Sequence, residues 1–335
     1  MDLIDIDAEA LRRTKEDIYP NRYGKWDTEI NLYPVGREPN HSYDITFIGT
    51  PPDTHIAIAR EQLATTRALV VEKPLCGPNL ANLGDLIEEI RLHDVRAFVG
   101  YNHLCGKALH CLRQILQAEN VSPVSIDVEF REHWGGIFAA HPWLAGPGDS
   151  YLGFSERGGG ATGEHSHGIS LWQHLALQTG QGRVTEVYAN TRTVTKAGLD
   201  YDQISIANLK TESGLIGRLA QDVVTNPPQK NARIFSESGI IEVSLSERPG
   251  VESVSTKLSE NSSYEVFEKN RPDDFIAELD HIEDVLMDQT NQKYDKSPLN
   301  FDRGLETMLV ISAILKSART GHPVSIDYSN LNSAL

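Results

Sequence analysis

The first 120 residues alternate between short apolar runs and amphipathic segments. Strands are expected at 3–6, 44–49, 68–71 and 97–101, and helices at 8–17, 54–64 and 79–92. The clearest helix is 79–92, because its leucines and isoleucines recur every three or four residues on one face. Strands that alternate with helices through short loops predict a parallel sheet with right-handed crossovers.

After residue 120 the apolar positions recur every second residue instead. This period predicts antiparallel strands at 124–130, 184–194, 204–209, 215–222, 234–235 and 240–245, and helices at 162–177, 275–288 and 301–320. The predicted fold class is α/β. It combines a Rossmann-like parallel sheet in residues 1–118 with an α+β domain in residues 119–335, which has a large, mostly antiparallel open sheet. The last helix is expected to pack back on the first domain.

Charge and cysteine content narrow the classes of function. The chain has 335 residues, with 31 basic and 47 acidic side chains, for a net charge of -16. Such a surface repels phosphate backbones and anionic membranes, so neither nucleic acid nor membrane is an expected partner. Three cysteines fit neither a disulfide framework nor a zinc site, and no apolar run reaches the length of a membrane span. A soluble, cytoplasmic protein is expected.

Two polar turns follow predicted strands of the first half. Glu72 and Lys73 come directly after the strand at 68–71, and Thr50, Pro51 and Pro52 follow the strand at 44–49. Ligands of open α/β sheets bind beyond the carboxyl ends of the strands, so Lys73 would reach into such a crevice. The alternatives are a solvated lysine and a purely structural helix cap.

Two acidic residues lie at the end of the first predicted strand. Asp5 and Asp7 stand where a dinucleotide fold binds the ribose hydroxyls of adenosine, an arrangement that favours NAD over its 2'-phosphorylated form.

The densest polar cluster is GGGATGEHSH, residues 158–167. Its glycines allow close approach of the backbone to a ligand, and on one helix Glu164 and His167 would share a face. Three interpretations are open: acid–base chemistry, a structural histidine cluster, or a metal site. The metal site lacks the HExxH order and an obvious third ligand, so no bound metal is expected.

Five segments together resemble the Gfo/Idh/MocA family of oxidoreductases. They are FIGTPPDTH, VVEKPL, VGYNHL, GGGATGEHSHGISLWQHL and the ending SARTGHPVSID, in that order over nearly the whole chain. The resemblance implies hydride transfer between NAD, or alternatively NADP, and a hydroxyl of a sugar, nucleotide sugar or cyclitol.

The resemblance also implies roles for individual residues. Lys73 matches the catalytic lysine of the family, His167 the helix histidine, and Glu164 a position that is often aspartate. The cofactor residues implied are Asp5, Ile6, Thr50, Pro51, Pro52, His55, Glu72, Lys73 and Asn102. The substrate residues implied are Arg131, His133, Trp134 and His165.

The chain departs from the family pattern in two places. Ser170 stands where related sequences carry an acid, and no glycine-rich GxGxxG turn is present. The first strand resembles the family's second, so the nucleotide domain is expected to be incomplete and to bind NAD weakly.

Two other functions remain open: a non-catalytic sensor that kept the fold, and a redox-assisted lyase or glycosidase. Assembly is expected as a homodimer or homotetramer through the uncovered face of the large sheet. Alternating apolar residues, Val187, Ala189, Ile204 and Ile206, are expected to supply that face.

Overall fold

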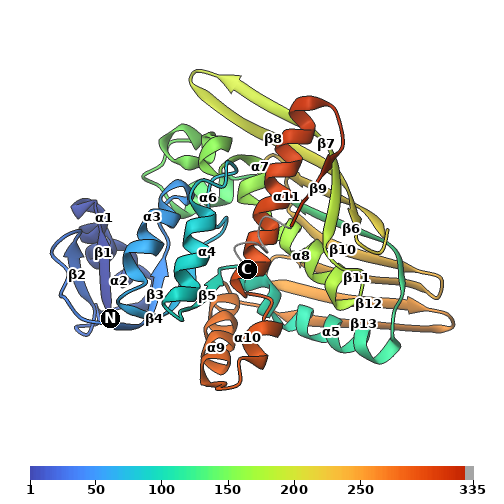
Figure 1. Cartoon of the computed structure of the whole chain (residues 1–335), viewed down its shortest axis with the longest axis horizontal. Helices are drawn as coiled ribbons and strands as arrows, with labels where there is room; N and C mark the ends of the chain where they lie inside the picture. The colour runs from blue at the N-terminus through green and yellow to red at the C-terminus, as the bar shows by residue number, and fades with distance from the viewer. Residues whose placement is uncertain (329–335) are drawn as a thin grey trace. The chain divides into compact units, whose positions relative to one another are not determined.

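The structure is a computed structural model that describes residues 1–328. Its internal contacts divide the chain into two compact units, residues 1–43 and the residues from 44 onward. Figure 1 gives the order of their elements along the chain.

The first unit holds a small β-α-β arrangement. Strand β1 (Asp2–Asp5) leads into helix α1 (Ala8–Arg13), which continues through a π-turn at Thr14–Ile18 into α2 (Tyr19–Tyr23) and then β2 (Asn31–Pro34). The two strands pair in parallel, with Leu3 opposite Leu32. Helix α1 begins where it does because the Asp7 side chain accepts a hydrogen bond from the backbone N–H of Glu9.

The second unit starts with a three-stranded parallel sheet, in the order β3-β4-β5. Its elements are β3 (Tyr43–Ile48), α3 (Pro52–Gln62), β4 (Thr66–Val71), α4 (Leu83–Leu92) and β5 (Arg96–Val99). Strand β4 is central and almost fully buried, as its run of apolar residues predicts. The apolar face of α4, which includes Leu86, Ile87 and Ile90, is likewise buried.

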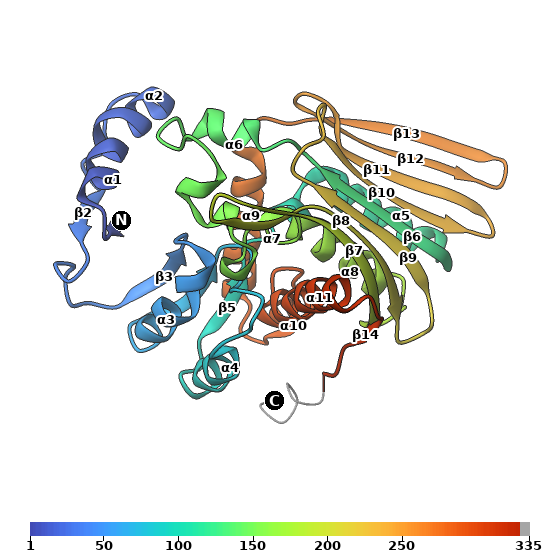
Figure 2. The same cartoon turned by 90° about the horizontal axis from the view of Figure 1, so that it is seen from above.

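A nine-stranded, mostly antiparallel sheet follows, in the order β13-β12-β11-β10-β6-β9-β8-β7-β14 (Figure 2). Its strands are β6 (Pro123–Arg131), β7 (Val184–Lys196), β8 (Leu199–Thr211), β9 (Ile216–Asp222), β10 (Gln229–Ser236), β11 (Gly239–Arg248), β12 (Val251–Leu258), β13 (Asn261–Glu268) and β14 (Val324–Ser325). Among the strands described for this sheet, β6 and β9 form the one parallel pair. The predicted fold class, a parallel sheet joined to a large antiparallel one, is confirmed.

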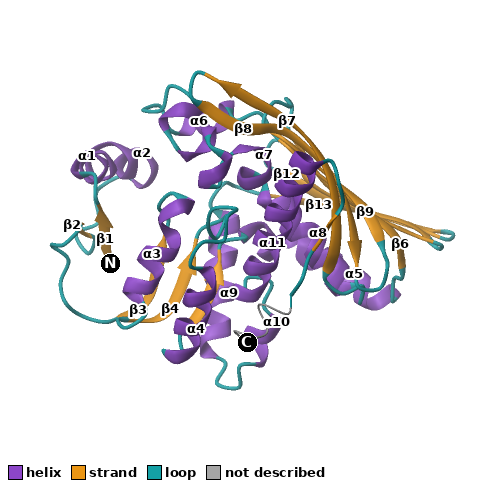
Figure 3. Ribbon diagram, turned by 45° about the horizontal axis from the view of Figure 1, so that its top comes forward, coloured by secondary structure: helices purple, strands orange, loops and turns teal. Residues whose placement is uncertain are grey.

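Helices cover one face of the large sheet (Figure 3). Those that lie on it are α5 (Lys107–Glu119), α8 (Ser166–Gln178) and α11 (Phe301–Thr320), and the remaining helices are α6 (Gly135–Ala140), α7 (Gly160–Glu164), α9 (Asp273–Met287) and α10 (Gln292–Lys296). Helix α11 also packs on β5, where a Cβ at Gly304 would collide with Val99. The small and the large sheet of this unit therefore share one hydrophobic core.

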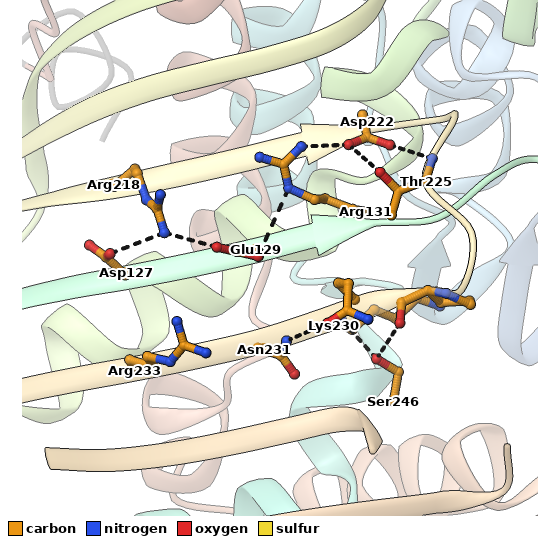
Figure 4. A network of polar contacts seen from close by, with 12 residues as sticks. Asp127, Glu129, Arg131, Arg218, Asp222, Thr225, Lys230, Asn231, Arg233 and Ser246 are labelled. Atoms are coloured by element: carbon orange, nitrogen blue, oxygen red, sulfur yellow. Dashed lines mark hydrogen bonds and ion pairs between the residues drawn. The ribbon is translucent and has the colours of Figure 1, made fainter. Parts of the chain in front are cut away.

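The opposite face of the large sheet carries a network of ion pairs (Figure 4). Arg218 contacts Asp127 at 3.3 Å and Glu129 at 2.8 Å, and Arg131 contacts Asp222 at 2.6 Å. The expected apolar surface is only partly present here, and that expectation needs correction. Ile204 and Ile206 are half-buried and lie on this open face, because they pair with Asp222 and Ala220.

Val187 and Ala189 lie on the other face, and the expectation that they would supply the uncovered surface is wrong. Both are buried, and helix α11 packs on their strand. The backbone N–H of Ala189 donates to the Ser317 hydroxyl of α11 at 3.0 Å. The pairing of β7 with β8 places residues of even and odd number on opposite faces, so the two pairs of apolar residues cannot share one surface.

The helix expected at 162–177 is interrupted. Helix α7 ends at Glu164 and α8 begins at Ser166, because His165 has φ −95° and ψ 27°. The backbone N–H of Gly168 bonds to the carbonyl of His165 instead of that of Glu164, at 2.8 Å. The expectation that Glu164 and His167 lie on the face of one continuous helix is therefore wrong, and the carbonyl of Glu164 is free for another donor.

Candidate active site

Three polar turns lie at the carboxyl ends of β3, β4 and β5. They contain Thr50, Lys73 and Asn102 respectively, and parallel strands bring such turns to one edge of a sheet. The ring of His55 ties two of them together, since its Nε2 lies 2.7 Å from the Thr50 carbonyl and its Nδ1 3.3 Å from that of Leu75. His55 is fully buried, so it positions these turns from below.

The turns differ in solvent exposure. Thr50 and Pro51 are exposed, whereas Pro52 is buried. Asn102 is 8% exposed, and its Oδ1 is buried without a hydrogen-bond partner. Buried amide oxygens normally have a hydrogen-bond partner, so this atom stands out as an unpaired acceptor.

Lys73 is held at the edge by Glu164. Its Nζ donates to the Glu164 carbonyl at 2.9 Å and lies 3.2 Å from the Oε2 of the same residue. The carbonyl is available because the helix breaks at the next residue. Both side chains are nearly buried, with 13% and 15% exposed, so the charges face each other with little solvent between them.

Glu164 is ionised in this setting. Burial would raise the pKa of its carboxyl, but Lys73, His165 and the hydroxyl of Tyr151 together hold it below the usual value. Tyr151 donates to Oε2 at 3.2 Å. The neighbouring Glu72 behaves oppositely: burial raises its pKa despite the charge of Lys73. The site therefore contains an ionised carboxylate, Glu164, in contact with Lys73, and a second acid, Glu72, whose ionisation is opposed by burial.

Helix α7 is anchored from below by Asp202. This buried carboxylate accepts the backbone N–H of Thr162 at 2.8 Å and its hydroxyl at 2.6 Å. A Cβ at Gly160, where φ is +77°, would collide with Asp202, so the glycine run is required for this approach. The glycines of 158–163 thus serve chain packing at the start of α7.

His167 lies in an aromatic cage. Its ring centroid is 4.6 Å from that of His103, 5.7 Å from Tyr101 and 5.9 Å from the stacked ring of Phe130. Its Nδ1 is buried without a hydrogen-bond partner. Burial, followed by the neighbouring His103, Lys73, Lys230 and His165, holds the pKa of His167 well below its usual value. The ring is therefore a neutral imidazole at pH 7.

His165 is buried and serves the backbone. Its Nε2 lies 3.2 Å from the Glu132 carbonyl, and its own carbonyl accepts the amide of Gln221 at 2.5 Å. Burial lowers the pKa of this imidazole as well. It therefore joins α7 and α8 to the sheet strands beneath them.

The structure does not bring Arg131 to this cluster. Arg131 alternates with Phe130 along β6, so it lies on the open face of the sheet in the ion-pair network. The cation on the cluster's side is Lys230, which pairs with Phe130 across the strands. Its Nζ lies 5.3 Å from the ring of Phe130 and 2.7 Å from the carboxylate of Glu132.

His133 and Trp134 differ in exposure. His133 is exposed, and its Nδ1 accepts the backbone N–H of Gly135 at 2.9 Å. Trp134 is buried against Tyr201, with ring centroids 5.0 Å apart, in the small core that includes Ala161. Of this predicted pair, His133 is exposed to solvent and Trp134 is not.

Asp5 and Ile6 belong to the first unit. Asp5 ends β1, and its carboxylate accepts the backbone N–H of Asp7 at 2.8 Å. Ile6 is 87% exposed.

Lys230 and Tyr151 were not found from the sequence. Lys230 lies in an antiparallel strand about 60 residues beyond His167 in the chain, where only the strand pairing brings it near Phe130. Tyr151 follows a proline- and glycine-rich loop. The sequence carries no signal for the register that pairs Lys230 with Phe130.

No protein-family model matches the sequence, and no curated protein matches it. Solved structures do. The aldose-aldose oxidoreductase from Caulobacter crescentus complexed with glycerol matches at 18% identity and a TM-score of 0.73, over 96% of this chain and 90% of that one. The WlbA dehydrogenase from Bordetella pertussis, in complex with NADH and UDP-GlcNAcA, matches at 18% identity and 0.68, over 97% and 90%.

A levoglucosan dehydrogenase complexed with NADH and levoglucosan matches at 14% identity and a TM-score of 0.71, over 97% of this chain and 89% of that one. These neighbours are oxidoreductases of the Gfo/Idh/MocA type. At such identities the likeness establishes the fold, and the fold predicted from the sequence motifs is theirs.

Membrane-spanning helices and clusters of metal ligands are both absent from residues 1–328. No helix there combines the length and the apolar character that crossing a membrane requires. In the same range no three histidine, cysteine, aspartate or glutamate side chains gather as metal ligands would.

Proposed function

We propose that the protein is an NAD-dependent oxidoreductase that transfers a hydride between nicotinamide and a hydroxyl of a sugar, nucleotide sugar or cyclitol. The observation that carries this proposal is the Lys73–Glu164 contact beside the caged ring of His167, at the carboxyl edge of a parallel sheet. Neighbours of the same fold are sugar and nucleotide-sugar oxidoreductases, which supports it.

The residues at the sheet edge fit a nicotinamide. Its carboxamide carries N–H donors, and the unpartnered Oδ1 of Asn102 is a buried acceptor of the matching kind. Thr50, Pro51 and the start of α3 would lie along the rest of the cofactor. NAD, when bound, supplies the hydride acceptor or donor. Neighbours crystallised with NADH or NAD+ favour NAD over NADP.

The chain's own residues would handle the substrate oxygen and its proton. The ammonium group of Lys73 stabilises negative charge that develops on the oxygen, and Glu164 holds that group in place. His167, a neutral imidazole, can accept the hydroxyl proton. His133 and Lys230 are the further polar groups proposed to meet the substrate.

The test incubates the purified full chain with NAD and a panel of aldoses, sugar acids, nucleotide sugars and cyclitols, and follows the absorbance of reduced nicotinamide. Turnover of one class is expected. Retained NAD without turnover of any member would favour the sensor, and release of a cleaved sugar without net NADH would favour redox-assisted lyase or glycosidase chemistry.

We also propose that the chain works as a homodimer or homotetramer in the cytoplasm. Ile204 and Ile206 remain half-buried on the open sheet face, which a second sheet would cover. The three cysteines, Cys76, Cys105 and Cys111, are free thiols, as a reducing compartment favours.

A further inference from the structure

A run of four paired polar side chains leads away from His167 into the protein. His103 contacts the ring of His167 edge to face, and its Nδ1 lies 2.9 Å from the Oδ2 of Asp274 on α9. The same oxygen contacts the Nζ of Lys269 at 2.5 Å, which also lies 2.6 Å from the carboxylate of Glu252. None of these four residues was singled out by the sequence.

Of the three rings around His167, that of His103 has a nitrogen in contact with a charged side chain, Asp274. Tyr101 is buried among core residues and Phe130 is part of the sheet core. Because His167 has no hydrogen-bond partner at Nδ1, packing against these walls sets its ring orientation. If the His103 ring rotated, the His167 ring packed against it could rotate as well.

The charges around the pair fix its protonation. Burial would raise the pKa of Asp274, but His103 and Lys269 hold it below the usual value, so it is a carboxylate. Burial lowers the pKa of His103, and this outweighs the opposing effect of Asp274. The Nδ1 of His103 and the Oδ2 of Asp274 are in close contact without the geometry of a formed hydrogen bond. A carboxylate oxygen 2.9 Å from Nδ1 favours the tautomer of the neutral ring that carries its proton on Nδ1 and leaves Nε2 as an acceptor.

The groups that face the two histidines come from several elements. Lys73 follows β4, Lys230 lies on β10 and His165 lies between α7 and α8; each opposes a positive charge on His167. Lys269 and Lys230 do the same for His103, and Asp274 alone favours its protonation. Asp274 is thus the acid in contact with His103, and its removal is expected to change the tautomer of that ring.

We propose that His103 and Asp274 form a positioning pair for His167: Asp274 fixes the tautomer and orientation of His103, and His103 fixes the ring of His167 against the reacting hydroxyl. This inference rests on the oxidoreductase function proposed above. Neither residue is proposed to touch the substrate; their effect passes through His167.

The test is Asp274→Asn in the full chain, with the exposed Asp280→Asn on the same helix as the matched control. Asp274→Asn is expected to lower kcat about 10-fold, with KM changed less than about twofold, as for other groups that orient a catalytic histidine. Asp274→Glu should restore part of the loss, and Asp280→Asn should behave as the wild type.

A second readout needs neither substrate nor cofactor. Ring ¹⁵N spectra should show His103 protonated at Nδ1 in the wild type and in Asp280→Asn, and at Nε2 or in mixed tautomers in Asp274→Asn. If Asp274→Asn does not fold, His103→Gln, which leaves Asp274 paired with Lys269, must lower kcat to the same degree.

The outcomes separate this inference from the proposed function. An altered His103 tautomer with unchanged kcat would overturn the positioning role while turnover itself stands. A wild-type His103 unprotonated at Nδ1 would overturn it as well, without any assay. Absence of turnover by the wild type, with the expected tautomers seen, would overturn the proposed function and with it the pair's role in catalysis.

Discussion

Lys73 is bound through two different oxygen atoms of Glu164, the main-chain carbonyl at 2.9 Å and the side-chain carboxylate at 3.2 Å. The two contacts come from one residue only because α7 ends there. A lysine held in this way has few rotamers left, so little further entropy is lost when it meets a substrate oxygen.

Replacing Lys73 by alanine should reduce turnover by about 100-fold or more, because the charge that stabilises the reacting oxygen is gone. NAD affinity, measured by calorimetric titration, should change far less. Lys316→Ala removes an exposed lysine of α11 and is the control. Wild-type rates for Lys73→Ala with the true substrate would disprove its catalytic role.

Glu278→Gln should stabilise the protein in mildly alkaline solution. This residue of α9 is 5% exposed, and its Oε1 has no hydrogen-bond partner. Burial, then the charges of Glu72 and Asp274, raises its pKa to about 8. The folded state therefore keeps a proton that the unfolded state loses near pH 4.5, and stability falls as pH rises between these values.

The glutamine variant removes this dependence. At pH 8 its thermal midpoint should be higher than that of the wild type, and its free energy of unfolding should be larger by up to a few kcal/mol. Near pH 4.5 the two midpoints should match. Glu283→Gln, an exposed acid of the same helix, should follow the wild type at both pH values. Equal midpoints for Glu278→Gln and wild type at pH 8 would show that ionising Glu278 in the folded state costs no stability.

Gly168→Ala should be destabilising by about 1–3 kcal/mol, because the added Cβ would lie 2.8 Å from the Cβ of Phe130. The comparison is Gly84→Ala in α4, where nothing lies within 4 Å, and which should gain up to about 1 kcal/mol. Urea denaturation measures both. A neutral Gly168→Ala would mean that α8 can move away from β6 freely.

Ile206→Glu tests the proposed assembly. Light scattering should give the wild type at a multiple of 37.1 kDa and the variant at the monomer mass, because a charge on the open face opposes sheet-to-sheet packing. Leu92→Glu on α4, where the leucine is already 81% exposed, should keep the wild-type mass. A monomeric wild type at micromolar concentration would refute the assembly.

Periodicity predicted most elements of the fold. The helix expected at 301–320 is α11 without change, and the strand at 68–71 is the core of β4. Helix α5 was missed although Leu109, Leu112 and Leu116 recur at helical spacing, and β13 was missed because its polar sequence buries little. An edge strand such as β13, whose residues are almost all exposed, carries a weak local signal.

The candidate site was predictable only where it is continuous in sequence. Lys73 and the segment that contains Glu164 and His167 stand out as motifs. The break at His165, which frees a carbonyl for Lys73, depends on the sheet below, where Gln221 takes the carbonyl of His165. The opposite faces of Arg131 and Lys230 follow from strand register, which a single sequence does not reveal.

The carbonyl contact of Lys73 has a consequence for mutational scans. A main-chain oxygen is present whatever side chain residue 164 carries, so every substitution there removes at most one of the two contacts. Position 164 should therefore tolerate more replacements than position 73. Substitutions that let α7 and α8 join into one continuous helix should lower turnover more than substitutions at position 164 or position 73, because they withdraw the main-chain carbonyl from Lys73.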